Sequence, residues 1–258
     1  MRINRSLGTF VALAILAAAT CIAGCRGGPS NQRPETDADA FLSLPGVDAV
    51  YDVIDGPKDD AFPFVGCLRT EGGELIGTGV LIDPLTVLTV GHVADQNPVW
   101  FENGATISAV TRIACHPQYN PVPGLGVDLG ICLLKDPVPC ASYPAVNRAL
   151  DLKRMDQLTT VGYSHLVKKA SMPNVFLYFG NPTEESQALC LTTNVTTFWF
   201  GDSGGPILAW RNGGWTVYGL MSRMLIYDAT VMDNVGQRVD VHIEWIEDNR
   251  AKAPAAAE

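Results

Sequence analysis

The sequence has little charge, and the charge that it has is mostly acidic. Charged residues make up 17% of the 258 residues, and the formal net charge is −9. Binding to nucleic acid requires a basic surface, which this composition does not supply, so we expect no nucleic-acid partner. Hydrophobic residues make up 47% of the chain, which predicts a globular protein with a sizeable core.

Helical periodicity is scarce as well. The 25 glycines and 17 prolines favour short elements joined by turns. The segments "GELIGTGVLID" and "LTVLTVGHV" predict two strands around a turn at Asp83-Pro84, and "PILAWRNGGWTVYGLMS" predicts a hairpin that turns at residues 212–214. Only Val239 to Arg250 has a clear helical spacing. These patterns indicate an all-β barrel or sandwich with one late helix.

No apolar run is long enough for a comfortable membrane span. The run from Leu7 to Ile22 is short and follows a basic start, which predicts a signal peptide over residues 1–24. The end of this run, "IAGC", resembles the lipobox of bacterial lipoproteins, in which Cys25 becomes the lipidated first residue. Cys21 is an alternative acceptor, and an ordinary secretory signal that happens to contain cysteine is another.

The polar segment 25–48 predicts a flexible tether, because it contains almost no large apolar residue. A protein domain over 49–250 and a disordered tail over 251–258 complete the expected organisation. We therefore expect an exported protein of the cell envelope, held at the membrane by a lipid anchor. A cut in the tether would release it to the outside.

The segment "GDSGGP", residues 201–206, places a serine among three glycines and a proline, which end any regular element. Such a turn is either a tight loop or a cradle that exposes the Ser203 hydroxyl beside backbone N–H groups. A serine nucleophile needs a base, and the base needs an acid that fixes its tautomer. His92 is the best placed of four histidines, because it ends a β-forming apolar run; the others are His116, His165 and His242.

Five segments resemble, in order, the motifs of the trypsin-like serine proteases, which have the chymotrypsin fold. They are "LTVGHV", "RIACHPQYN", "VDLGICLLKDPV", "GDSGGP", and "VYGLMS" followed by "QRVDVHIEWI". The resemblance covers about Val53 to Asp248. It implies two packed six-stranded antiparallel β-barrels, over about residues 50–141 and 142–248, with a C-terminal helix. It also implies a serine endopeptidase that acts on protein or peptide substrates without a cofactor or a metal.

The resemblance assigns a role to each matching residue. Ser203 would be the nucleophile, His92 the general base and then the general acid, and Asp128 the group that orients and stabilises the imidazolium. The backbone N–H groups of Gly201 and Ser203 would form the oxyanion hole. His116, in the His-Pro segment, would be structural.

The same resemblance locates the substrate-binding residues Thr197, Ser222 and Met224. Thr197 would lie at the base of the specificity pocket, and because it is not an acid, cleavage after Arg or Lys is not supported. Met224 replaces a small wall residue and would narrow the pocket. Ser222 would lie beside the triad acid. We expect small or apolar residues before the scissile bond.

Two features depart from the family pattern. Val93 follows His92 where many members have a cysteine. The activation motif is also poor, since "VIDG", Val53 to Gly56, lacks the second glycine. We therefore expect the uncut chain to be competent, with the buried carboxylate of Asp202 satisfied by an internal donor other than a new N-terminus.

The chain has seven cysteines. Without Cys21 and Cys25, an odd number remains, so at least one thiol is unpaired or bonds elsewhere. An exported protein can form disulfides. The resemblance favours a bridge between Cys115 and Cys132, with buried free thiols as the alternative; the remaining candidates are Cys67, Cys140 and Cys190.

Two other functions fit parts of the sequence. The turn at 201–205 also satisfies G-x-S-x-G, the nucleophile elbow of α/β-hydrolases, with Asp228 or Asp233 as the acid and His242 as the base. That elbow must lead into a helix, whereas this sequence predicts a hairpin. The third possibility is a protease-like fold that acts as a binding lipoprotein without cutting, which the weak activation motif favours.

Overall fold

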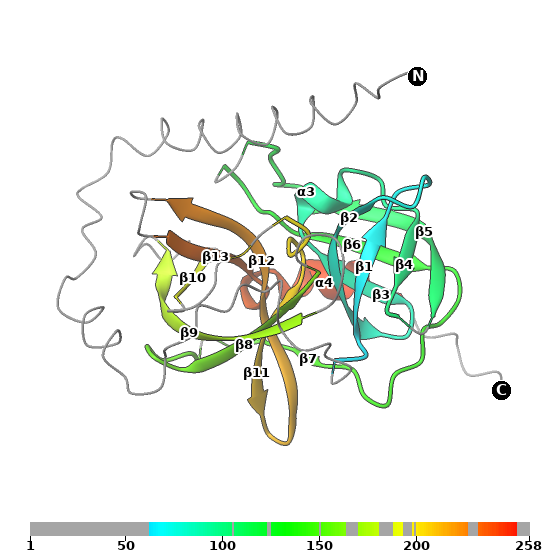
Figure 1. Cartoon of the computed structure of the whole chain (residues 1–258). Coiled ribbons are helices and arrows are strands. Elements are labelled where there is room, and N and C mark those ends of the chain that lie inside the picture. The colour runs from blue at the N-terminus through cyan, green and yellow to red at the C-terminus, as the bar shows by residue number, and fades with distance from the viewer. Residues whose placement is uncertain are drawn as a thin grey trace, which may run out of the picture.

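The computed structural model describes residues 62–104, 106–122, 125–149, 151–163, 170–180, 188–192, 198, 200–226 and 232–251. These residues form two β-structures that lie side by side, followed by a short C-terminal helix (Figure 1). The expected signal peptide, the tether and the lipidated cysteine Cys25 lie outside the described residues. So do Thr197 and His165.

The first β-structure is a closed barrel with the strand order β1-β2-β3-β6-β5-β4. Every neighbouring pair in it is antiparallel. Its fully buried side chains include Leu68, Leu81 and Phe101. The strands are β1 (Val65–Arg69), β2 (Leu75–Asp83), β3 (Thr86–Thr89), β4 (Trp100–Glu102), β5 (Ile107–Cys115) and β6 (Gly130–Leu134).

The second β-structure has the strand order β11-β8-β9-β10-β13-β12-β7. An additional pairing between β11 and β12 joins six of these strands into a ring, and β7 adds to β12 in parallel. This arrangement confirms the predicted chymotrypsin-like class. The strands are β7 (Ala145–Val146), β8 (Gln157–Gly162), β9 (Ala170–Gly180), β10 (Ala188–Thr192), β11 (Pro206–Arg211), β12 (Gly214–Ile226) and β13 (Met232–Arg238).

The hairpin of β11 and β12 turns where the sequence predicts. Asn212 and Gly213 have φ angles of 52° and 81°, which suits a two-residue hairpin turn. Trp210 lies opposite Trp215, and their rings meet edge to face with centroids 5.2 Å apart. Because the serine turn leads into strand β11 and not into a helix, the α/β-hydrolase alternative is wrong.

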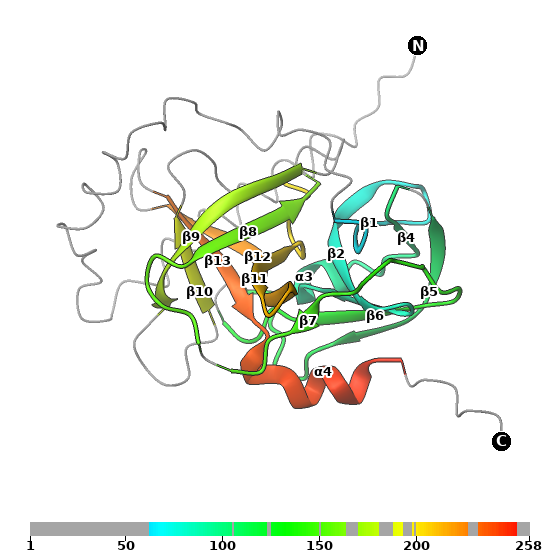
Figure 2. The ribbon, with the colours of Figure 1, turned by 90° about the horizontal axis from the view of Figure 1, so that it is seen from below.

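The C-terminal helix leaves the second ring and packs on the first barrel. It begins with a 3-10 turn, η3 (Asp240–His242), and continues as α4 (Ile243–Asn249), so the predicted helix is confirmed. Ile246 is fully buried. Directly after the helix in the sequence, the Arg250 Nε donates to the Asp83 Oδ2 at 3.1 Å. This hydrogen bond holds the end of the helix on the outside of the first barrel (Figure 2).

The expected disulfide between Cys115 and Cys132 is not formed. Neither cysteine forms a disulfide in the described part of the chain, nor do Cys67 and Cys140, and the side chain of Cys190 lies outside the described residues. The strand register gives the reason: Cys132 lies opposite Ile113, and Cys115 lies opposite Gly130. The two cysteines are therefore diagonal neighbours, about 7–8 Å apart, and a bridge needs Cα atoms closer than about 7 Å.

Two histidines meet edge to face at the junction of the helix and the first barrel. The ring centroid of His116 lies 4.7 Å from that of His242 and 5.0 Å from that of Trp245. His242 is 8% exposed, and its Nε2 has no hydrogen-bond partner in the described part of the chain. Burial, followed by the charges of His116 and Arg238, lowers the pKa of His242 to about 4, while Asp240 opposes this shift.

This depressed pKa predicts an acid-sensitive fold. The unfolded chain binds a proton to His242 near pH 6.5 and the folded chain only near 4, so stability falls as the pH drops through this range. Replacing His242 with phenylalanine removes the titration and keeps an aromatic ring at the site. We expect the urea midpoint of His242→Phe to fall less than that of the wild type between pH 7 and 4.5. Equal losses in the two proteins would contradict the assignment.

Candidate active site

The turn that carries Ser203 depends on glycine for its shape. Gly201 and Gly204 have φ angles of 100° and 87°, which side chains rarely tolerate. A Cβ on Gly204 would lie 2.1 Å from the Thr89 Oγ1 and 2.2 Å from the carbonyl oxygen of Thr78. The turn belongs to the second ring but lies directly against β2 and β3 of the first barrel.

Thr78, which is fully buried on β2, holds this turn in place. Its hydroxyl donates to the carbonyl oxygen of Gly201 at 2.6 Å, and its N–H donates to that of Ser203 at 2.8 Å. In contrast, the N–H groups of Gly201 and Ser203 make no hydrogen bond within the described residues. Both carbonyls are therefore turned to the barrel, and two N–H groups stay available for a negatively charged oxygen.

His92 lies on the short helix α3 (Gly91–Ala94), directly after β3. Its Nδ1 lies 2.9 Å from the Asp128 Oδ2, and its backbone N–H donates to the Asp128 Oδ1, also at 2.9 Å. Both carboxylate oxygens thus contact the same residue, which fixes the ring relative to the acid. The His92 side chain is 38% exposed, so its other edge can meet a substrate.

Asp128 lies on the segment before β6, and Ser222 of β12 contacts it from the second ring. The Ser222 hydroxyl donates to the Asp128 Oδ2 at 2.6 Å. The β12–β13 register slips between Met221 and Arg223, so Ser222 is the extra residue of a bulge, a device that re-aims a side chain. Burial raises the pKa of Asp128, but the charge of His92 and the hydrogen bonds from His92 and Ser222 lower it below its ordinary value overall.

Gly77 of β2 lies between the serine turn and Val93, the residue after His92. A Cβ on Gly77 would lie 2.9 Å from the carbonyl oxygen of Ser203 and 2.6 Å from a methyl carbon of Val93. The Ser203 hydroxyl makes no hydrogen bond in the described part of the chain. Such contacts are often long before substrate binds. Val93, fully buried in the barrel core, takes the place of the family cysteine by apolar packing.

The other predicted site residues are only partly placed. Met224 lies on β12 opposite Asn234, with its side chain outside the described residues. Asp202 is fully buried, and a Cβ on Gly162 of β8 would lie 2.2 Å from its Oδ1. An exposed aromatic residue that the sequence reasoning did not single out, Phe200, immediately precedes Gly201 and is 60% exposed.

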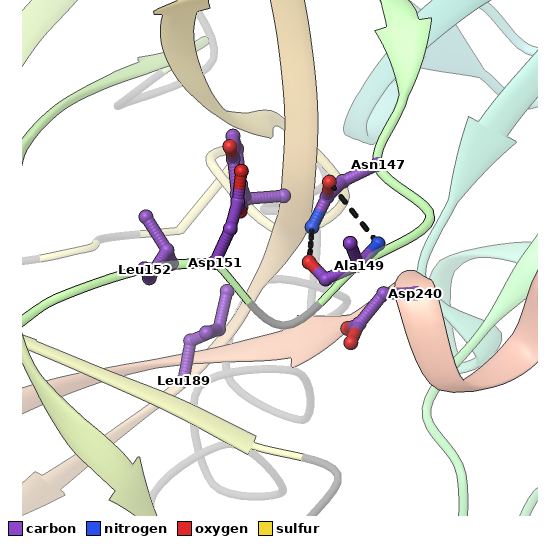
Figure 3. Close-up of a pocket in the computed structure, with 7 residues that line it drawn as sticks. Asn147, Ala149, Asp151, Leu152, Leu189 and Asp240 are labelled. Carbon is purple, nitrogen blue, oxygen red and sulfur yellow. Dashed lines mark hydrogen bonds between the residues drawn. The ribbon is translucent and has the colours of Figure 1, made fainter.

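A shallow depression lies on the second ring (Figure 3). Within it, the Asn147 amide bonds back to the main chain of Ala149 at 2.5 Å. None of the residues predicted for the active site lines this depression. The lining residues are Asn147, Ala149, Asp151, Leu152, Leu189, Tyr218 and Asp240.

A closed six-stranded barrel and a second ring, with a His–Asp pair and a glycine-rich serine turn at their junction, are the arrangement of the chymotrypsin-like proteins. The family model described as Trypsin matches residues 54–246, and the chain belongs to this family. The chain is also similar to Serine protease 28 of Mus musculus. The two are 24% identical over 210 residues, which cover 65% of this chain and 75% of the relative. These findings indicate a function of the serine protease type.

The role of Thr78 can be tested with an isosteric change. Thr78→Val removes the hydroxyl that donates to Gly201 and that accepts the N–H of Tyr163, leaving two buried groups unpaired. We expect the free energy of unfolding to fall by about 1–3 kcal/mol, and the labelling of Ser203 by a fluorophosphonate to slow. Thr111→Val, at an exposed threonine of β5, is the matched control and should change neither quantity. Equal effects of the two substitutions would contradict the role.

Proposed function

We propose that this protein is a serine endopeptidase that hydrolyses peptide bonds with Ser203, His92 and Asp128. The observation that carries the proposal is the two-point contact between His92 and Asp128, with the Nδ1 edge of the imidazole on the carboxylate. A carboxylate at Nδ1 favours the tautomer with its proton there, which leaves the Nε2 lone pair for the serine.

The proposed reaction proceeds in two halves. The Ser203 Oγ attacks the scissile carbonyl carbon while its proton moves to the His92 Nε2, and the N–H groups of Gly201 and Ser203 bind the resulting oxyanion. The intermediate collapses as His92 gives this proton to the leaving amine, and an acyl-enzyme remains. In the second half, water attacks the acyl-enzyme in place of Ser203, His92 transfers the proton in the same way, and the carboxylic acid product leaves. Asp128, whose pKa is lowered, stays ionised at neutral pH and stabilises the imidazolium in both halves.

The proposed substrate is an extended segment of a protein or peptide, bound along the junction between the two β-structures. Thr197 and Met224 favour a small or apolar residue before the scissile bond, since neither supplies a negative charge for Arg or Lys. Phe200 adds an exposed apolar face next to the Gly201 N–H.

The proposed location is the cell envelope, where Cys25 carries the lipid and residues 26 to about 48 form the tether. No helix in the described part of the chain is long and apolar enough to cross a membrane. In this proposal, the lipid at Cys25 is the attachment point.

The nucleophile is tested by Ser203→Ala, which should remove nearly all peptidase activity and leave folding intact, since loss of a triad typically costs on the order of 10⁶ in rate. A fluorophosphonate should label the wild type at Ser203, located by mass spectrometry, and should not label the variant. A wild type that folds but neither cleaves nor takes up the label would favour the binding lipoprotein instead.

The proposed general base, His92, can be tested in the same way. His92→Ala should be about as damaging as Ser203→Ala, and the double variant little worse, because the two residues act as a unit. His242→Phe is the matched histidine control, since His242 packs on His116, and it should retain activity at neutral pH. Activity that survives His92→Ala would rule out the assigned base.

The tether generates a separate prediction about activation. Asp202 is fully buried, and we expect an internal donor other than a new N-terminus to satisfy its carboxylate. In this chain, a cut that frees an N-terminus at Val53 would sever the tether. We expect a chain of residues 26–258 to be active without cleavage, as active as one that begins at Val53 or Ile54. Activity confined to the shorter chains would instead identify a zymogen that is shed on activation.

A further inference from the structure

A buried amide on β13 contacts the backbone of the triad acid. The side chain of Gln237 is 4% exposed, and its Oε1 accepts the N–H of Asp128 at 2.9 Å. The two residues lie 109 positions apart, one on the second ring and one on the segment before β6. This hydrogen bond therefore spans the junction between the two β-structures.

Gln237 projects from a firmly held backbone. It pairs with Leu220 of β12 on one side and with Ala188 of β10 on the other. The Gln237 Nε2 donates to the carbonyl oxygen of Arg238 at 3.3 Å. This contact orients the amide, because only the oxygen of the side chain can then face the Asp128 N–H.

The second ring thus holds Asp128 at two points. Ser222 donates to the carboxylate, and Gln237 accepts from the main chain. The two holding residues lie on neighbouring strands, since the bulge at Ser222 faces Gly236 and Val235, next to Gln237 along β13. The acid therefore cannot turn about either contact without breaking the other.

Resting on the proposed function, we propose that Gln237 is a positioning residue for the reaction. It fixes the main chain of Asp128 from the second ring, so that both carboxylate oxygens stay on His92. Because the amide is neutral, it does this without adding charge beside the ion pair. The titratable groups that interact with Asp128 in the described part of the chain are His92, Cys115 and Tyr119.

Three variants of the full chain separate positioning from general stability. Gln237→Met keeps the length of the side chain and removes the acceptor. Gln237→Glu keeps an oxygen that can accept the Asp128 N–H; burial next to Asp128 favours its neutral, protonated form, whose O–H can still donate to the Arg238 carbonyl. Asn174→Leu removes a different buried amide of the second ring, one that donates to the Thr160 hydroxyl at 2.8 Å, and serves as the control.

We expect kcat of Gln237→Met to fall roughly tenfold with KM changed less than about twofold, the size of one lost hydrogen bond in the reaction. The apparent pKa that defines the acid limb of its pH–rate profile should shift. Gln237→Glu should recover kcat to within about threefold of the wild type. Asn174→Leu should lower stability without changing kcat or the pH profile of the folded enzyme.

A second readout does not depend on turnover. The proton on the His92 Nδ1 should give a downfield NMR resonance, which should shift or broaden in Gln237→Met and stay in place in Asn174→Leu. Full kcat with an unmoved resonance in Gln237→Met would overturn the proposal, as would equal losses in the Met and Glu variants. If the wild type proves to lack peptidase activity, the resonance still decides the role of Gln237, so failure of the proposed function remains distinguishable.

Discussion

The site depends on one hydrogen-bonded side chain, the hydroxyl of Thr78. It donates to the Gly201 carbonyl at 2.6 Å and accepts the N–H of Tyr163 at 3.1 Å, so a strand of the first barrel holds two segments of the second ring. With the carbonyls of the serine turn held in this way, the N–H groups of Gly201 and Ser203 make no hydrogen bond within the described residues. Gly204 is required because a Cβ there would collide with Thr89 and Thr78 of the first barrel.

The two β-structures hold parts of the site for each other. The first barrel supplies His92 and Asp128, yet the acid is held by Ser222 and Gln237 of the second ring. The second ring supplies Ser203, yet its turn is held by Thr78 of the first barrel. A shift of one unit against the other would therefore break these hydrogen bonds, so the bonds fix the relative placement of the two units.

Much of this arrangement could be predicted from short motifs. The order of the histidine, acid and serine segments predicted the fold class, and the structure brings His92 and Asp128 within 2.9 Å. The turn at residues 212–214 and the late helix followed from glycine and from apolar spacing. These signals are local, so a single sequence is enough to find them.

The rest depended on contacts between distant segments. Thr78 lies 123 residues from Gly201, and Gln237 lies 109 residues from Asp128, so neither spacing forms a motif. The Cys115–Cys132 bridge was predicted from neighbouring strands, but a pair must also lie in register, and Cys132 lies opposite Ile113. Neighbouring strands can be predicted from the order of motifs, whereas register requires coordinates.

The long sequence separation of these contacts also affects when the site forms during folding. Closing the chain between distant segments costs entropy before the contacts between them stabilise the fold. A nascent or half-folded chain can contain a complete first barrel and still hold no aligned serine. Asp128 is therefore held at both its carboxylate and its main chain only in a chain whose last strand, β13, is in place.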